Sequence, residues 1–317
     1  RAELSAKGAK YLAVWMYVIH ELEDAVADCL AGDIFDNEDS NAAGDSPHAW
    51  DEGWAFYAGS LEGMDGSGTG YLMYDLADKR GPQFGTIADS GTSLANVEAL
   101  TVANAGLAKI LSCDCNGVAE ELLKFVTQMT IPPLQGMIRY FYLADPMVNG
   151  GSCTDGVCTY DKSWAEGWAF AAAVLPQIDR CDKSVAQLVN DNINVDGVET
   201  PMKDGYEYVK AWVETTYECL GLTCADVGEY QDSNGVVFPG MEACMEPVSP
   251  PVSPGGSKSK KSSIKSALII IIVVVVVAVA LLIFVAGAMR YNANKNKPAE
   301  ALPKDVEMHD DKPNSMI

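Results

Sequence analysis

The stretch WDEGWAFYAGS at residues 50–60 and the stretch WAEGWAFAAAV at residues 164–174 share seven identical residues in eleven aligned positions. They lie 114 positions apart, and each contains two tryptophans. Their apolar residues recur at the spacing of a helix, and neither stretch contains proline. Such a match is hard to reach by chance. We therefore predict an internal repeat, with one helix of this sequence in each half of the chain.

The rest of the region before residue 245 also has helical periodicity. Apolar residues recur at helical spacing in 11–30, 93–111, 119–129, 135–143, 185–189 and 206–220. Stretches rich in Gly and Asp, at 63–70 and 148–156, separate these segments as loops. The prediction is an all-α fold in which two homologous helical halves, about 1–115 and 116–245, pack face to face into one ectodomain.

A long apolar run lies near the C-terminus. Residues 266–289 are 24 positions without a charged side chain, whereas about 20 residues are needed to cross a bilayer core. This run is predicted to be a single transmembrane helix. Residues 246–265, rich in Pro, Ser and Lys, then form a stalk, and 290–317 form a short disordered tail.

The charge of the chain is strongly negative and unevenly distributed. The net charge is −22, and 39 of the 44 acidic residues precede residue 257. This composition argues against nucleic acid as a partner, because phosphate backbones recruit Lys and Arg. An acidic surface suits metal cations, cationic partners or a saline medium.

Cysteine usage indicates an oxidising compartment. All nine cysteines precede residue 245, in spacings that suit disulfides. The closely spaced pairs predict bridges Cys153–Cys158 and Cys219–Cys224, and the odd count leaves at least one cysteine over. Zinc is the competing interpretation, but the sequence contains no CxxC pair. We therefore place the N-terminal domain outside the plasma membrane and the tail in the cytosol.

Histidine and carboxylate side chains recur one helical turn apart in the first half. Such a pair presents an imidazole and a carboxylate on one helix face, as in di-iron carboxylate bundles. These donors suit Fe, Mn or Zn better than Ca or Mg. The candidate metal ligands are His20 with Glu23 and Asp24, His48 with Asp51 and Glu52, and Glu166 from the second copy of the repeat.

The repeated glutamate has two readings. If the halves pack about a pseudo-dyad, Glu52 and Glu166 approach each other, and His48, Glu23 and His20 complete a metal shell. Alternatively, each is a buried glutamate that hydrogen-bonds a neighbouring helix end or an arginine such as Arg139. Gly53 and Gly167 would allow a neighbouring helix to approach the repeated helices closely.

Several stretches in order resemble the algal iron-assimilation family of low-iron-inducible extracellular or periplasmic proteins. They are HELEDAVADC, HAWDEGWAFYAGSLEG, LMYDLADKR, IPPLQGMIRYFY, AEGWAFAAAVLPQI and VKAWVETTYECLGLTC, within about residues 10–230. The resemblance implies a role in iron acquisition, in which Fe³⁺ or Fe²⁺ is bound or concentrated and an iron permease or reductase is the partner. Members of the family are often secreted without a membrane anchor, so the apolar run 266–289 departs from the family pattern.

Two other classes of protein stay open. One is a structural or adhesive ectodomain. In that case the acidic face serves only to keep the domain solvated, and the repeated motif belongs to the hydrophobic core. The other is a carboxylate-bridged, metal-dependent oxidoreductase. No G-x-S-x-G, H-E-x-x-H, P-loop or G-x-G-x-x-G motif is present, so we expect a binding protein and not an enzyme.

Overall fold

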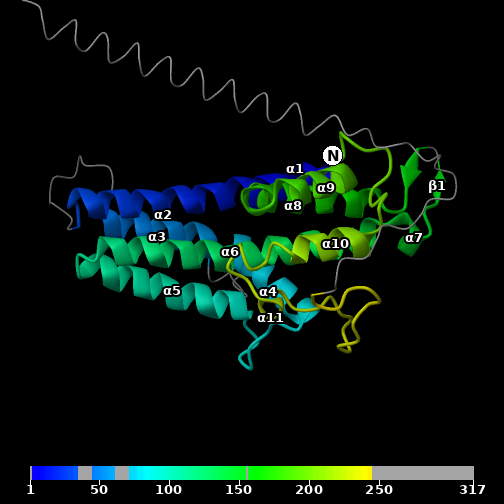
Figure 1. Ribbon diagram of the computed structural model, residues 1–317. Coiled ribbons are helices and arrows are strands. Elements are labelled where there is room, and N and C mark those ends of the chain that lie inside the picture. Colours follow the sequence, from blue (N-terminus) through cyan, green and yellow to red (C-terminus); the bar gives the residue numbers. More distant parts are fainter. Residues whose placement is uncertain (1, 35–44, 61–70, 155, 245–317) are drawn as a thin grey trace, which may run out of the picture. The chain divides into compact units, whose positions relative to one another are not determined.

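The N-terminal residues form one continuous helical segment along the length of the domain (Figure 1). It consists of α1 (Ala2–Lys7), a π-helical stretch η1 (Gly8–Ala13) and α2 (Val14–Ala31). The computed structural model describes residues 2–34, 45–60, 71–154 and 156–244, which belong to one compact unit, Arg1–Val252. The predicted transmembrane helix 266–289, the stalk 246–265, the tail 290–317 and the loop 63–70 lie outside the described residues.

The described residues are mostly helical, so the all-α prediction is confirmed. The two strands are only two residues long and form an antiparallel hairpin. The other elements are α3 (Ser46–Ala58), α4 (Leu72–Phe84), α5 (Leu94–Leu111), α6 (Cys115–Ala144), α7 (Pro146–Asn149), β1 (Cys153–Thr154), β2 (Val157–Cys158), α8 (Asp161–Cys181), α9 (Lys183–Ile193), α10 (Tyr206–Glu214) and α11 (Cys224–Val227).

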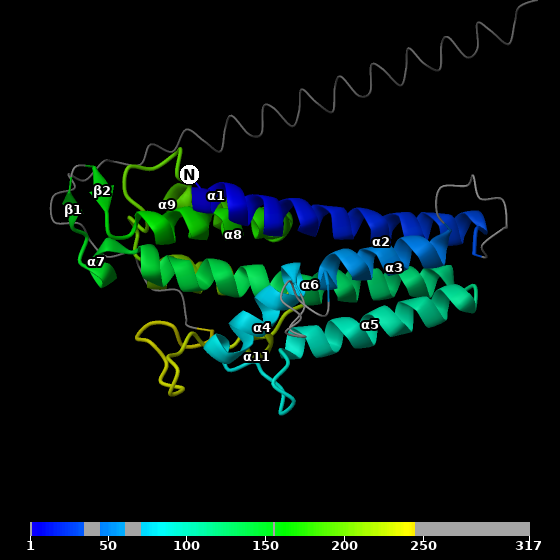
Figure 2. The same cartoon turned by 180° about the vertical axis from the view of Figure 1, so that it is seen from behind.

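The long helix α6 is the centre of the domain, and α2, α4, α5, α8 and α10 all contact it (Figures 1 and 2). The prediction of two helices, 119–129 and 135–143, was wrong, because α6 continues through Pro132 and Pro133. A proline removes a backbone donor and disfavours a helix interior. Every residue from 129 to 138 is buried, so packing on all sides of this segment outweighs that local penalty.

The two copies of the repeated motif form α3 and α8, and each packs closely on a long helix. A Cβ atom at Gly53 of α3 would lie 2.8 Å from Leu22 Cδ2 on α2. A Cβ atom at Gly167 of α8 would lie 2.9 Å from Tyr140 Cβ on α6. Glycine at this motif position therefore permits the close approach that the sequence predicts.

The first tryptophan of each copy joins its helix to a later one. Trp50 Nε1 donates to the carbonyl oxygen of Ala103 on α5 at 2.8 Å. Trp164 Nε1 donates to the carbonyl oxygen of Ile193, the last residue of α9, at 2.8 Å. The two copies therefore make corresponding contacts with different helices.

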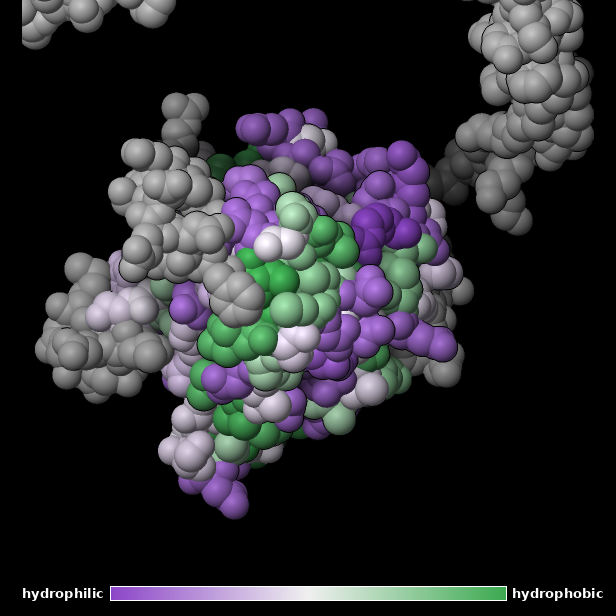
Figure 3. Space-filling view, turned by 90° about the vertical axis from the view of Figure 1, so that its left-hand side faces the viewer, coloured by the Kyte–Doolittle hydropathy of each residue, from purple (hydrophilic) through white to green (hydrophobic). Residues whose placement is uncertain are grey.

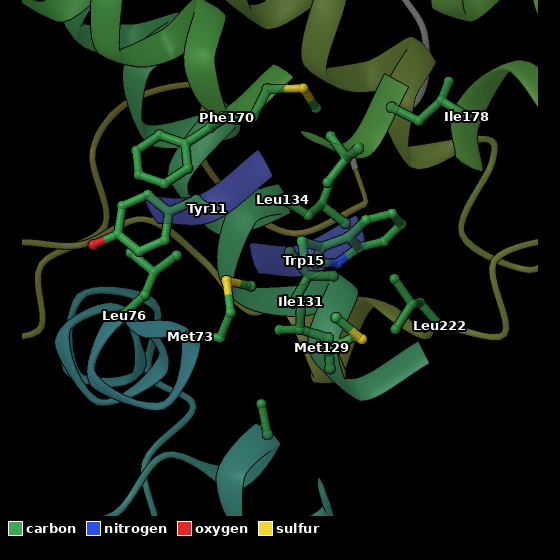
Figure 4. Close-up of a cluster of buried hydrophobic side chains, with 14 of the residues drawn as sticks. Tyr11, Trp15, Met73, Leu76, Met129, Ile131, Leu134, Phe170, Ile178 and Leu222 are labelled. Carbon is green, nitrogen blue, oxygen red and sulfur yellow. The ribbon is translucent and has the colours of Figure 1, made fainter. Parts of the chain in front are cut away.

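Side chains from several helices meet in a continuous apolar core (Figure 4). Tyr11 stacks on Phe170 with ring centroids 5.2 Å apart. Met73 and Leu76 of α4 and Leu134 of α6 lie in the same cluster, and none is more than 1% exposed. The core therefore joins the N-terminal helix to α4, α6 and α8.

Helix α5 is apolar but lies at the surface of the domain. By length and composition alone it is apolar enough to cross a membrane, and it is the one such helix in the described part of the chain, with 39% of its residues buried. It contacts α3, α4 and α6, while Leu94, Val97, Leu100 and Leu111 are exposed. Figure 3 shows the end of the domain seen from the left-hand side of Figure 1, where hydrophobic surface lies between hydrophilic areas. These contacts place α5 as an outer helix of the domain.

Four disulfides join the described segments, and they involve eight of the nine cysteines. The hairpin bridge Cys153–Cys158 is confirmed, whereas the predicted bridge Cys219–Cys224 was wrong. Packing brings the end of α8 beside the turn that follows α10, so Cys219 instead reaches Cys181. The bridges are Cys29–Cys115, Cys153–Cys158, Cys181–Cys219 and Cys224–Cys244, and Cys113 is free and exposed.

Candidate functional site

Helices α2 and α3 each carry one histidine–carboxylate pair. His20 Nε2 lies 3.4 Å from Asp24 Oδ2 on α2, and His48 Nε2 lies 3.4 Å from Glu52 Oε1 on α3. In each pair the histidine and the carboxylate are one helical turn apart, as the sequence predicts. The histidine side chains are 59% and 65% exposed, so solvent ions can reach both pairs.

The start of α3 is held by two polar contacts that place His48 in the first turn. Asp45 accepts a hydrogen bond from the His48 backbone N–H at 2.9 Å and caps the helix, with Pro47 directly after the first residue. Ser46 Oγ donates to the Ala25 carbonyl oxygen of α2 at 2.7 Å. Local sequence and contact with α2 together set the orientation of the His48–Glu52 pair.

Tyr17 of α2 contacts His20 of its own helix and also helix α3. Its ring packs edge-on against Phe56 of α3, with centroids 4.5 Å apart. A hydrogen bond to the Glu21 carboxylate raises the pKa of Tyr17, and burial and the charges of Glu52 and Asp24 raise it further. The carboxylates of Glu21, Asp24 and Glu52 therefore act together on the Tyr17 hydroxyl.

Glu21 is a residue of this face that the sequence analysis did not select. It is only 7% exposed and follows Tyr17 by one helical turn. The four-residue spacing between Tyr17 and Glu21, in the run YVIHE, is the signal that could have identified it. We define the α2–α3 face as Tyr17, His20, Glu21, Asp24, His48 and Glu52.

Glu23 and Asp51 lie one turn from His20 and His48 but point to solvent. Both residues are exposed, and neither forms an ion pair within the described part of the chain. They add negative charge near the α2–α3 face without joining either pair.

Glu166 occupies a different environment. Its side chain is 6% exposed, accepts a hydrogen bond from the Tyr140 hydroxyl, and lies 3.7 Å from Lys162 Nζ. Of the two readings for the repeated glutamate, the buried one therefore describes Glu166. Its partners are a tyrosine and a lysine and not the proposed Arg139.

The predicted shell of Glu52, Glu166, His48, Glu23 and His20 is not assembled. Among the described residues, no three His, Cys, Asp or Glu side chains are grouped closely enough to hold a metal ion. The physical reason is that α3 packs on α2 whereas α8 packs on α6, toward the other end of the domain (Figures 1 and 2). The expectation that the two glutamates meet was wrong for this arrangement, while metal binding by either histidine pair stays a prediction.

The all-α fold, the four disulfides and the acidic composition together define a helical domain of an oxidising, extracytoplasmic compartment. The family model of the low iron-inducible periplasmic protein, Fea1, matches residues 12–236. The chain therefore belongs to this family, and the resemblance found in the sequence is confirmed. No curated protein and no solved structure matches the chain.

Proposed function

We propose that this chain binds iron outside the cytosol and concentrates it for uptake, without catalysing a reaction. The family connects the chain with low iron and the periplasm. The observation that supports iron binding is the presence of two exposed histidine–carboxylate pairs on adjacent helices, which Tyr17 and Phe56 join by a ring contact. Imidazole, carboxylate and phenol groups are donors that suit iron.

The geometry favours an exchangeable site. Each pair offers one nitrogen and one oxygen donor, and water completes the coordination of a bound ion. A cation at this face also offsets the repulsion among the Glu21, Asp24 and Glu52 carboxylates. A protein that passes iron to an uptake partner must release it, and few protein ligands allow release.

Equilibrium dialysis of the full chain in mild detergent, with ferrous iron under nitrogen and with ferric nitrilotriacetate, tests this proposal. The double variant His20→Ala/His48→Ala should weaken iron binding at least tenfold, because it removes both nitrogen donors. The matched control is His309→Ala, which removes a histidine of the C-terminal tail.

The substituted histidines are exposed, so the double variant should keep the melting temperature of the unaltered protein. If the folded double variant binds iron as strongly as the unaltered protein, the α2–α3 face is not the iron-binding site. Repeated oxidation of ferrous iron by oxygen would favour the oxidoreductase alternative.

We further propose that residues 266–289 anchor the domain to the plasma membrane, with an iron permease or reductase as the receiver. The support is the uncharged run of 24 residues behind a domain in which eight of the nine cysteines form disulfides. Protease added to intact cells should remove the acidic domain and spare an epitope at Ile317. Protection of the acidic domain would contradict this orientation.

A further inference from the structure

A cavity of about 330 Å³ lies where the end of α4 meets the chain that follows α11 (yellow in Figure 1). Pro82 and Gln83 of α4 line one side, and residues from the range 230–238 line the other. The volume is at the lower end of the range for small-molecule sites. None of the lining residues belongs to the α2–α3 face, so this cavity is a separate feature of the domain.

Two aromatic rings form the apolar part of the cavity wall. The ring centroids of Tyr230 and Phe238 lie 4.7 Å apart. From behind, Tyr230 packs on Phe84 of α4 at 5.5 Å, and Phe238 packs on Tyr142 of α6 at 5.1 Å. These contacts hold both rings in place, so the wall is formed before a ligand arrives and suits the stacking of a flat ligand.

Backbone hydrogen bonds join the two sides of the cavity. The Gln231 N–H donates to the Gln83 carbonyl oxygen at 2.9 Å, and the Glu229 N–H donates to the Phe84 carbonyl oxygen at 3.1 Å. The side chains of Gln83 and Gln231 therefore start from neighbouring backbone positions, and both line the cavity.

The hydrogen-bond partners fix which way each glutamine amide is turned. Gln83 Oε1 accepts a hydrogen bond from Arg80 Nη1, and a guanidinium group can only donate. Gln231 Nε2 donates to the Pro82 carbonyl oxygen at 3.1 Å, and a carbonyl oxygen can only accept. The chemistry of the partners thus assigns the oxygen and the nitrogen of both amides.

One donor and one acceptor are left over at the cavity. Among the described residues, Gln83 Nε2 and Gln231 Oε1 have no hydrogen-bond partner. Both side chains are partly exposed, and neither free atom is buried. A free donor and a free acceptor on neighbouring residues complement the edge of an amide, which presents a carbonyl oxygen beside an N–H.

Charge at the cavity disfavours an anionic ligand. Asp232 lines the cavity and accepts backbone hydrogen bonds from Val236 at 2.9 Å and from Asn234 at 2.8 Å. These bonds lower the pKa of Asp232, so its carboxylate stays ionised at neutral pH. The domain as a whole is also strongly acidic, which repels anions further.

We propose that this cavity binds a small, uncharged planar heterocycle with an amide edge, of the class that includes pyrimidine bases and nicotinamide. The ring stacks against Tyr230 and Phe238. Its carbonyl oxygen accepts a hydrogen bond from Gln83 Nε2, and its N–H donates to Gln231 Oε1. The site shares no residue with the α2–α3 face and does not depend on iron binding.

Calorimetric titration of the metal-free full chain in mild detergent tests the proposal, with uracil and nicotinamide as probes. At least one of them should bind saturably, with one site per chain. The matched probes are dimethyluracil, with a methyl group on both ring nitrogens, and nicotinamide with two methyl groups on its amide nitrogen. Each should bind at least tenfold more weakly than its parent, because it keeps the ring but has lost the N–H donor.

Two variants change the free groups and keep the bonds that hold the cavity. Gln83→Glu keeps an acceptor for Arg80 but loses the Nε2 donor, and Gln231→Lys keeps a donor for the Pro82 carbonyl oxygen but loses the acceptor. Each should weaken binding of the heterocycle at least tenfold. The control is Gln187→Lys, at an exposed glutamine of α9, which should bind as the wild type does.

Methyl glucoside is the competing probe, because sugar hydroxyls can also pair with free amide groups but a saturated ring has no flat aromatic face. It should bind at least tenfold more weakly than the heterocycle. If a variant does not fold, the comparison of parent and methylated probes on the wild type decides. Absence of saturable binding of both heterocycles would overturn the proposal, as would equal affinity for the methylated probes, tighter binding of methyl glucoside, or wild-type affinity in the folded variants.

Discussion

Glu52 and Glu166 show how one motif position can have two roles. Each glutamate has a tryptophan two positions before it and the sequence Gly-Trp-Ala-Phe directly after it. Glu52 is 42% exposed and lies beside His48, whereas Glu166 is 6% exposed and lies beside Tyr140 and Lys162. The difference in exposure arises from the neighbouring helix, because the helix of Glu52 packs on α2 and the helix of Glu166 packs on α6.

The two glutamates should respond differently to neutralisation. Glu52→Gln should weaken iron binding and change the free energy of unfolding by less than about 0.5 kcal/mol, because its side chain is partly exposed. Glu166→Gln should keep wild-type iron binding but destabilise the fold by about 1–2 kcal/mol, because it removes a buried charged hydrogen-bond acceptor. Iron dialysis and urea unfolding measure both effects, and the reverse pattern would return Glu166 to the metal site.

Asp28, in the last turn of α2, is unfavourably placed as an anion. Burial and the charges of Asp33, Asp24 and Asp45 raise its pKa, and a carboxylate near a helix C-terminus opposes the helix dipole. A raised native pKa means that ionisation weakens the fold. Asp28→Asn should therefore stabilise the protein at pH 7 by about 0.3–1 kcal/mol.

The stabilisation by Asp28→Asn should disappear below about pH 3.8, where the carboxyl group is protonated in both the folded and unfolded states. Urea unfolding from pH 3 to 7 measures this. The contrasting variant is Asp182→Ala, which removes the N-cap of α9 and should destabilise the fold at pH 7. Hydrogen bonds with Ser184 and Val185 lower the pKa of Asp182, so this second effect is lost as the pH falls. An Asp28→Asn gain that is equal at pH 3 and pH 7 would contradict the charge explanation.

Helix packing depends on small residues at defined crossings. Helix α5 meets α3 where Gly106 faces the indole ring of Trp50, and a Cβ atom on Gly106 would lie 1.9 Å from Trp50 Cζ2. The same indole donates to Ala103 of α5. Glycine at 106 therefore permits both the ring contact and the hydrogen bond.

Gly106→Ala should destabilise the domain by about 1–3 kcal/mol, because overpacking at Trp50 outweighs the higher helix propensity of alanine. The matched control is Gly8→Ala in η1, where a Cβ atom meets nothing within 4 Å. This control should be neutral or stabilise the fold by up to about 1 kcal/mol. Thermal unfolding distinguishes the two, and equal melting temperatures would show that the α3–α5 contact adapts to the added methyl group.

The disulfides connect distant parts of the domain. Cys29–Cys115 joins the end of α2 to the start of α6 over 86 residues, whereas Cys153–Cys158 closes a hairpin over five. The longer bridge restricts the unfolded chain more strongly. The domain is therefore held together covalently where its two longest helical segments meet.

Replacing Cys29 and Cys115 by serine should cost about 4.5 kcal/mol, and replacing Cys153 and Cys158 should cost about 2 kcal/mol, on the chain-entropy model. Denaturant unfolding of the two double variants measures the difference. Equal losses would show that contacts in the folded state, and not loop length, decide the contribution of each bridge.

Local properties of the chain predict the helical class, the helices of the repeated motif, the oxidised cysteines and the short Cys153–Cys158 bridge. Helical periodicity, composition and close cysteine spacing are properties of neighbouring residues, so no knowledge of distant contacts is needed. The histidine–carboxylate spacing within α2 and α3 is predictable for the same reason, since one helical turn sets it.

Contacts between distant residues decided the rest. Packing carried α6 through Pro132 and Pro133, paired Cys219 with Cys181, and separated Glu166 from Glu52. It also placed Arg80 beside the Phe170 ring and Arg139 beside the Tyr140 ring. These two rings stack on each other, although the two arginines are 59 positions apart in the chain. Such pairings depend on which helix faces cover one another, and local periodicity contains no information on that choice.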